Sequence, residues 1–171
     1  MVLLLLALAS CVAPQRAVPP PVAAPPVDAP RPAAPVADRY EGDWSTADLP
    51  PGEWMYSRTP RASFALFGVD RGGALAMIEC QGRAIRIGRA GTLAAGTRGI
   101  MRVRTSYAER QLPLHNDVDA RMVVTSLDGR DPLFDQISYS RGRFVIETSN
   151  QQPLLVPVRP EVQRVVEDCR V

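Results

Sequence analysis

The sequence predicts a mainly β protein, an antiparallel β-sandwich or small open barrel of six to eight strands with two short helices. Apolar and polar residues alternate with a period of two through much of residues 53–107, which is the pattern of half-buried strands. Glycine- and proline-rich turn signals interrupt this pattern at short intervals. The chain has 171 residues, of which 46% are hydrophobic, so it can form one packed domain with tails.

The earlier part of the domain consists of short expected strands joined by turns. The residues expected in these strands are 53–58, 62–69, 74–80, 83–89, 100–107 and 121–127. The segments 70–73 (Asp-Arg-Gly-Gly) and 81–82 (Gln-Gly) have the composition of hairpin turns. Strands that follow one another through such turns are expected to pair antiparallel.

The later part of the domain combines helices with strands. Asp131 can cap a short helix that has Pro132 at its first position and runs to about Tyr139. Two strands, residues 143–148 and 154–158, are expected to follow and to pair with each other.

A second helix is expected to begin at Pro160 and to end near Cys169. Within it, Val162, Val165 and Val166 recur at helical spacing and form one apolar face. This face predicts that the helix packs against the sheet.

The N-terminus has the features of an export signal. The apolar run Val2–Ala9 is too short to span a membrane as a helix, which needs roughly 20 residues. The ending Leu8-Ala9-Ser10-Cys11 resembles the lipobox of bacterial lipoproteins, which implies acyl chains on Cys11 and cleavage before it. Val12 at the next position implies sorting to the outer membrane. No Lys or Arg precedes the apolar run, so we expect the true start to lie further upstream; an ordinary signal peptide with a chance cysteine is the alternative.

A proline-rich segment follows the signal. Residues 12–38 contain nine of the 17 prolines, which prevent helix and sheet from propagating. We expect a disordered polyproline-II spacer of roughly 80 Å when extended, with docking onto an aromatic groove as the alternative role. The expected organisation is a signal peptide at 1–10, a lipidated cysteine with its linker at 11–41, and one β-rich domain at 42–171.

The cysteines predict one disulfide. If Cys11 is lipidated, Cys80 and Cys169 are the two thiols that remain in an oxidising compartment. A bond between them would fix the last helix to the sheet, whereas two buried free thiols are the alternative.

The C-terminal part of the domain resembles a group of uncharacterised bacterial envelope lipoproteins over residues 44–171. The motifs that carry this resemblance lie at 131–135 (Asp-Pro-Leu-Phe-Asp), 140–147 (Ser-Arg-Gly-Arg-Phe-Val-Ile-Glu) and 165–170 (Val-Val-Glu-Asp-Cys-Arg), with Pro157 between the last two. The order of elements is more distantly similar to periplasmic β-sandwich proteins of the invasion-associated locus B type. Both resemblances imply the fold, and neither supplies a catalytic residue.

Composition excludes several kinds of site. A net charge of +2 argues against nucleic-acid binding, and the 20 basic residues include no lysine, which excludes lysine-based catalysis. His115, Asp117 and Asp119 would share one face if their segment were extended, and could then hold a divalent metal; a solvated turn is the alternative. No G-x-S-x-G motif indicates a hydrolase.

Two surface sites remain as candidates. Arg86 lies on one expected strand and Arg102 and Arg104 on its expected neighbour, so the three could form an anion-binding face for carboxylates or phosphates. A solvated face balanced by acidic residues is the alternative. A set of aromatic residues could stack on sugars or could anchor the core, namely Trp44, Trp54 and Tyr56.

Together these features predict a non-enzymatic, lipid-anchored lipoprotein of the bacterial envelope. From the residue after its cysteine we expect it in the outer membrane, facing the periplasm. We expect an envelope protein as partner, with peptidoglycan or lipid phosphate as further ligands, and neither cofactor nor metal. The alternative functions are an inhibitor of hydrolases such as lysozyme and a metal-dependent enzyme.

Overall fold

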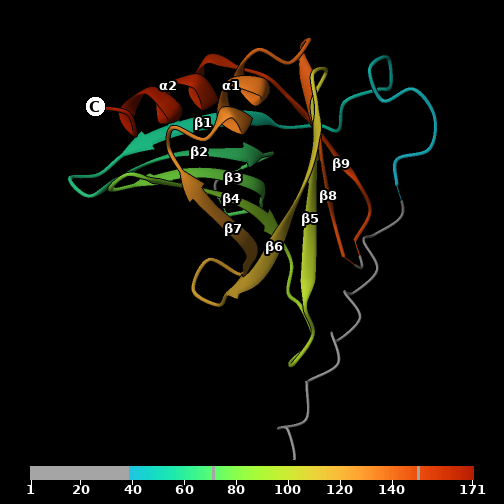
Figure 1. The fold of residues 1–171 in the computed structure, drawn as a ribbon, viewed down its shortest axis with the longest axis horizontal. Coiled ribbons are helices and arrows are strands. Elements are labelled where there is room, and N and C mark those ends of the chain that lie inside the picture. The colour runs from blue at the N-terminus through green and yellow to red at the C-terminus, as the bar shows by residue number, and fades with distance from the viewer. Residues whose placement is uncertain (1–38, 71, 150) are drawn as a thin grey trace, which may run out of the picture. The chain divides into compact units, whose positions relative to one another are not determined.

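The computed structural model describes residues 39–70, 72–149 and 151–171, which form one sheet of nine antiparallel strands and two helices (Figure 1). The elements are β1 (Glu53–Arg58), β2 (Ala62–Gly68), β3 (Ala74–Gln81), β4 (Ala84–Ala90), β5 (Gly99–Arg104), β6 (Glu109–Asp117), β7 (Met122–Asp128), α1 (Pro132–Ser138), β8 (Arg143–Thr148), β9 (Leu154–Pro157) and α2 (Pro160–Asp168). The strand order is β1-β2-β3-β4-β7-β6-β5-β8-β9. The predicted mainly β class with two short helices is confirmed, and the sheet is open, with one strand more than the six to eight expected.

Strand β6 divides the sheet into two halves because its two ends pair with different neighbours. Residues 109–114 pair with β5, whereas His115, Asn116 and Asp117 pair with β7. The strands β1–β4 and β7 therefore form one half, and β5, β8 and β9 continue from β6 as the other. Figure 1 shows that the strands of the two halves run in clearly different directions.

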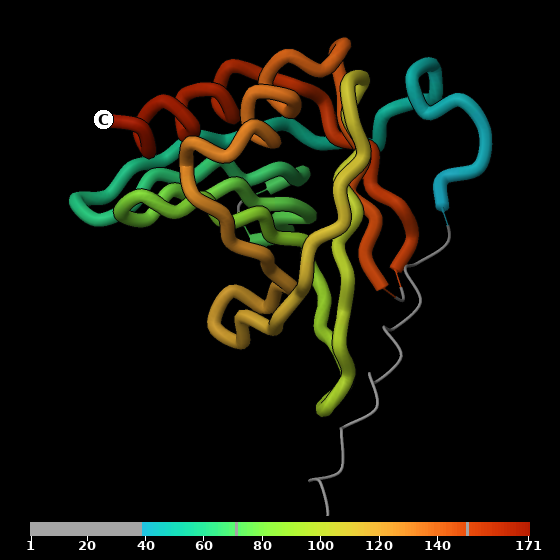
Figure 2. Tube along the Cα trace, viewed as in Figure 1, coloured from blue at the N-terminus to red at the C-terminus, as the bar shows by residue number. Residues whose placement is uncertain are grey.

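The main core lies between the inner faces of these halves and the two helices. Figure 2 shows the course of the backbone through these elements. On β5, Met101 and Val103 point into this core, which places Arg102 and Arg104 on the outer face. The large, fully buried core side chains include Phe67, Ile78, Ile85, Ile87, Met101, Leu133, Phe134, Ile137, Phe144 and Ile146. A smaller apolar cluster on the outer face of the first half contains Met77, Met122 and Val124.

Strand β6 was not among the predicted strands. Its sequence carries only two buried apolar side chains, Leu112 and Leu114, and Pro113 stands between them. Proline cannot donate a ladder hydrogen bond, so a proline within a run argues against a strand. Here Pro113 lies opposite Ile100 within the β5–β6 pairing, and the strand continues through it.

Both helices begin where the sequence predicts. The Asp131 side chain accepts a hydrogen bond from the Leu133 amide at 2.9 Å and so caps α1. In α2 the three valines at helical spacing are buried, and the helix packs on β1, β2 and β3. None of the helices in the described part of the chain is long and apolar enough to cross a membrane.

The predicted disulfide between Cys80 and Cys169 is confirmed. It joins β3 to the C-terminal cap of α2, with the two Cα atoms 5.5 Å apart. The expected signal peptide, Cys11 and residues 12–38 of the linker lie outside the described residues. Arg39 and Tyr40, which the sequence assigns to the linker, make contacts with the β strands.

Candidate functional site

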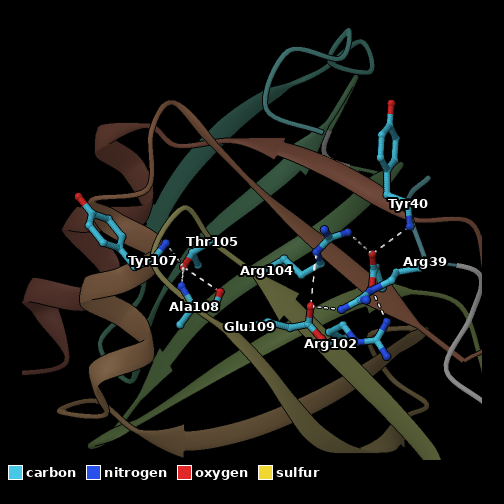
Figure 3. A network of polar contacts seen from close by, with 9 residues as sticks. Arg39, Tyr40, Arg102, Arg104, Thr105, Tyr107, Ala108 and Glu109 are labelled. Carbon is cyan, nitrogen blue, oxygen red and sulfur yellow. Dashed lines mark hydrogen bonds and ion pairs between the residues drawn. The ribbon is translucent and has the colours of Figure 1, made fainter. Parts of the chain in front are cut away.

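A buried carboxylate marks the place where the chain enters the domain. Glu147 on β8 is fully buried, although its side chain lies on the outer face of the sheet. Its carboxylate accepts hydrogen bonds from Arg102 Nη1 at 2.9 Å and from Arg104 Nη1 at 3.1 Å. The backbone N–H of Tyr40 donates a third hydrogen bond, at 3.0 Å (Figure 3). A buried charge is tolerated when it is paired and hydrogen-bonded, as this one is.

A second carboxylate, Glu109 on β6, completes the cluster. It forms ion pairs with Arg102 Nε at 3.0 Å and with Arg104 Nε at 3.6 Å. It also accepts a hydrogen bond from Arg39 (Figure 3). Arg102 and Arg104 are therefore each held between two carboxylates, and Arg39 joins them at the surface.

Strand register explains why these residues meet. Arg102 lies directly opposite Glu147 in the β5–β8 pairing, and Arg104 lies directly opposite Glu109 in the β5–β6 pairing. Opposite charges facing each other across an antiparallel pair stabilise a sheet. The alternation of β5 therefore aims both arginines at acidic side chains on the two neighbouring strands.

Residues 39–47 form a covering segment that contacts this outer face at several points. The Trp44 ring lies 5.9 Å from the Arg104 guanidinium carbon, and Arg143 donates a hydrogen bond to the Ala47 carbonyl. Val145 and Leu155 point away from the main core, yet only 0% and 4% of their surfaces are exposed. The entering segment thus packs on the sheet, and the carboxylate of Glu147 lies beneath it.

The expected anion-binding face of Arg86, Arg102 and Arg104 is not formed. Arg86 lies on β4, and β7 and β6 separate β4 from β5. Its guanidinium contacts Glu79 at 2.7 Å and also Asp117. All three arginines are thus neutralised by carboxylates, which β3, β6 and β8 supply.

The pKa values of the two acids beside Arg86 shift in opposite directions. Burial raises the pKa of Glu79, and the attraction of Arg86 only partly offsets this. The backbone amide of Ala120 and the hydrogen bond from Arg86 lower the pKa of Asp117. Asp117 is therefore the firmly ionised partner of the pair.

The hypothesis of a metal site at His115, Asp117 and Asp119 fails on geometry. Strand β6 ends at Asp117, so the extended conformation that would align the three side chains stops before Asp119. The Asp117 carboxylate already accepts hydrogen bonds from Arg86 and from the Ala120 amide. The described residues contain no group of three side chains suited to hold a metal.

The three aromatic residues are separate anchors and do not form a sugar-binding platform. Trp54 is buried against Phe67, and its indole N–H donates to the Pro157 carbonyl at 2.7 Å. Tyr56 lies on the same inner face, under Arg164, and donates a hydrogen bond to Asp168. Trp44 lies on the opposite face of the sheet, in the covering segment.

Four contributors to the cluster were missed by the sequence analysis: Arg39, Tyr40, Glu109 and Glu147. The signal that could reveal the cluster is Glu147 itself, a single acid that directly follows the apolar run Phe144–Ile146 within one strand. An acid in such a strand must be paired, and the nearby arginine-bearing strand offered the partners.

Comparison with known proteins gives no assignment: no protein family model, no curated protein and no solved structure matches this chain.

Proposed function

We propose that this protein is a membrane-anchored bacterial envelope lipoprotein whose β domain is a non-enzymatic binding or structural module. The main support for this proposal is that two of the three cysteines form a disulfide and the third lies in the lipobox-like sequence. Cys80 and Cys169 are bonded to each other, which leaves Cys11 as the remaining thiol, at the end of the sequence Leu8-Ala9-Ser10-Cys11. A disulfide also suits the oxidising compartment to which lipoproteins are exported.

The entry point of the chain supports the tether. Arg39 and Tyr40 follow the proline-rich segment directly, and they bind Glu109 and the buried Glu147. These two acids belong to β6 and β8 and share the arginines of β5. A pull on the tether would therefore be distributed over three strands.

The ion pairs favour a protein partner over an anionic polymer or lipid. Peptidoglycan carboxylates and lipid phosphates are bound by free guanidinium groups. The three arginines first considered for this role are all engaged by carboxylates within the domain. We therefore propose an envelope protein as the partner.

Metabolic labelling with palmitate tests the anchor. The wild-type chain is expected to incorporate the label, and Cys11→Ala to lose it. The matched control is the double variant Cys80→Ser/Cys169→Ser, which should keep the label. Equal labelling of Cys11→Ala and wild type would rule out lipidation at this residue.

Cross-linking in intact envelopes tests the partner. We expect one envelope protein to be enriched with the wild-type chain and reduced with Cys11→Ala, which would be misplaced. If the correctly lipidated chain captured no protein at all, the binding role would be wrong.

A further inference from the structure

Two exposed tyrosines form the walls of a surface groove away from the ion cluster. Tyr107 lies in the turn between β5 and β6, and Tyr139 follows α1. With Asp135 and Gln136 they line a groove of about 290 Å³. The two tyrosines are 63% and 69% exposed, whereas most large apolar side chains in the described residues are buried. Exposed aromatic side chains beside a groove indicate a binding site.

Hydrogen bonds hold the backbone in place at both walls of the groove. The Tyr107 N–H donates to Thr105 Oγ1 at 3.2 Å, which fixes the turn (Figure 3). The neighbouring Ser106 N–H donates to Ser140 Oγ at 3.0 Å, and the Arg141 N–H donates to Ser106 Oγ at 3.1 Å. The residue before Tyr107 is thus bonded to the residue after Tyr139. Such a prearranged site loses little conformational freedom when it binds a ligand.

The chemistry of the groove fits proline rings. Two of its four lining residues are tyrosines, and Asp135 Oδ1 already accepts a hydrogen bond from Arg170 at 2.7 Å. A sugar would require several free polar partners, whereas polyproline-II segments dock in aromatic grooves through their apolar rings. Their three-residue repeat places the two prolines of a P-x-x-P sequence on one edge. The Gln136 amide and the tyrosine hydroxyls can donate to the free carbonyls of such a segment.

The same chain carries a segment of this kind shortly before Arg39 in the sequence. Residues 12–38 contain one P-x-x-P sequence, Pro32-Ala33-Ala34-Pro35. Arg39 contacts Glu109, which is two residues from Tyr107 in the sequence. The lengths of the Arg39 and Glu109 side chains, added to the two Cα spacings from Glu109 to Tyr107, place the Arg39 Cα atom within about 20 Å of the Tyr107 Cα atom. At about 3.1 Å per residue, Pro32 can lie up to about 22 Å from Arg39 and Pro35 up to about 12 Å, which covers much of the range that this upper bound allows.

We propose that the groove between Tyr107 and Tyr139 binds the Pro32–Pro35 segment of the same chain. The binding itself does not depend on the proposed lipid anchor. If the anchor at Cys11 is present, the free tether ends at Arg39 when the groove is empty. It ends at Pro32 when the Pro32–Pro35 segment is bound. At about 3.1 Å per residue this lowers the reach of the domain by about 20 Å.

Tyrosine ring signals in NMR spectra test this proposal in the full chain carrying Cys11→Ser. The chain has four tyrosines, so ring-labelled samples give few signals, and Tyr→Phe variants assign them. We expect Pro32→Ala/Pro35→Ala to shift the Tyr107 and Tyr139 signals and to leave that of Tyr56 in place. The matched control Pro19→Ala/Pro20→Ala should shift neither. A synthetic peptide of residues 29–38 should restore the original positions in the Pro32→Ala/Pro35→Ala variant, saturably.

Three outcomes would overturn the proposal. Unchanged Tyr107 and Tyr139 signals in Pro32→Ala/Pro35→Ala would show that the segment is not in the groove. A shift that appears only at high protein concentration would assign the groove to the segment of a second copy. An N-acetylglucosamine oligomer could also shift the Tyr107 and Tyr139 signals. If it shifted them equally in wild type and in Pro32→Ala/Pro35→Ala, the groove would be open in both and would bind glycans.

Discussion

Replacing Glu147 with glutamine tests whether the buried carboxylate holds the entering chain against the domain. The carboxylate accepts two hydrogen bonds from guanidinium groups and one from the Tyr40 amide. Glutamine keeps one acceptor oxygen, but its NH₂ group replaces the other and faces a guanidinium donor. At least one hydrogen bond to a charged group is lost, and each is worth about 1.5–3 kcal/mol.

The expected loss of stability is about 3 kcal/mol. Breaking a buried ion pair costs about 3–5 kcal/mol, and the value here lies at the lower end because Glu109 still neutralises both arginines. With a urea dependence of about 2 kcal/mol per M, the unfolding midpoint should fall by about 1.5 M. Tryptophan fluorescence measures this midpoint, and the exposed Glu167→Gln is the matched control, with an expected change within about 0.5 kcal/mol.

Hydrogen exchange at the Tyr40 amide distinguishes release of the entering chain from a general loss of stability. The Tyr40 amide should exchange with solvent faster in Glu147→Gln than in the control, under conditions where both proteins are folded. A free energy of unfolding for Glu147→Gln within about 1 kcal/mol of wild type, with unchanged exchange at the Tyr40 amide, would refute the reasoning.

Three further predictions concern the stability of the domain. Cys80→Ser/Cys169→Ser removes the disulfide across a sequence separation of 89, and the chain-entropy model gives a loss of stability of about 4.5 kcal/mol. The urea unfolding midpoint of this variant should equal that of reduced wild type. A midpoint equal to that of oxidised wild type would contradict the disulfide. Burial acts to raise the pKa of Asp131, but hydrogen bonds from Arg110 and from the Leu133 amide outweigh it and hold this pKa below its ordinary value of 3.8. The stabilising effect of the ionised Asp131 is therefore present above pH 3.8 and is lost as the pH falls through the lowered pKa. Asp131→Ala should cost about 1–2 kcal/mol at pH 7 and less at pH 2, and a cost independent of pH would count against this pairing. Gly68→Ala places a Cβ 2.7 Å from a backbone oxygen of the β2–β3 turn and should cost about 2 kcal/mol in thermal unfolding, whereas an unchanged midpoint would show that the turn can yield.

The elements with strong local signals could be predicted from the sequence. The cap at Asp131, the proline at the start of α2 and the regular alternation of β5 each follow from residues close in the chain. The disulfide between Cys80 and Cys169 could be inferred because the number of thiols allowed one pair once Cys11 was set aside.

The candidate site could not be predicted because it depends on strand order. The sequence predicts that strands adjacent in the chain are neighbours in the sheet, which puts Arg86 beside Arg102. In the structure β6 and β7 are inserted between β4 and β5, and the proline in β6 had hidden that strand. Once β6 and β8 flank β5, Glu109 and Glu147 face its arginines, and the expected basic face becomes an ion cluster.

Intact-mass measurement of the protein extracted from membranes tests the proposed anchor and export most directly. The account predicts a chain that begins at Cys11, carries the mass of three acyl chains with their glycerol, and has no free thiol because Cys80 and Cys169 are bonded. A chain that retains residues 1–10, or that begins elsewhere without lipid, would contradict the anchored lipoprotein.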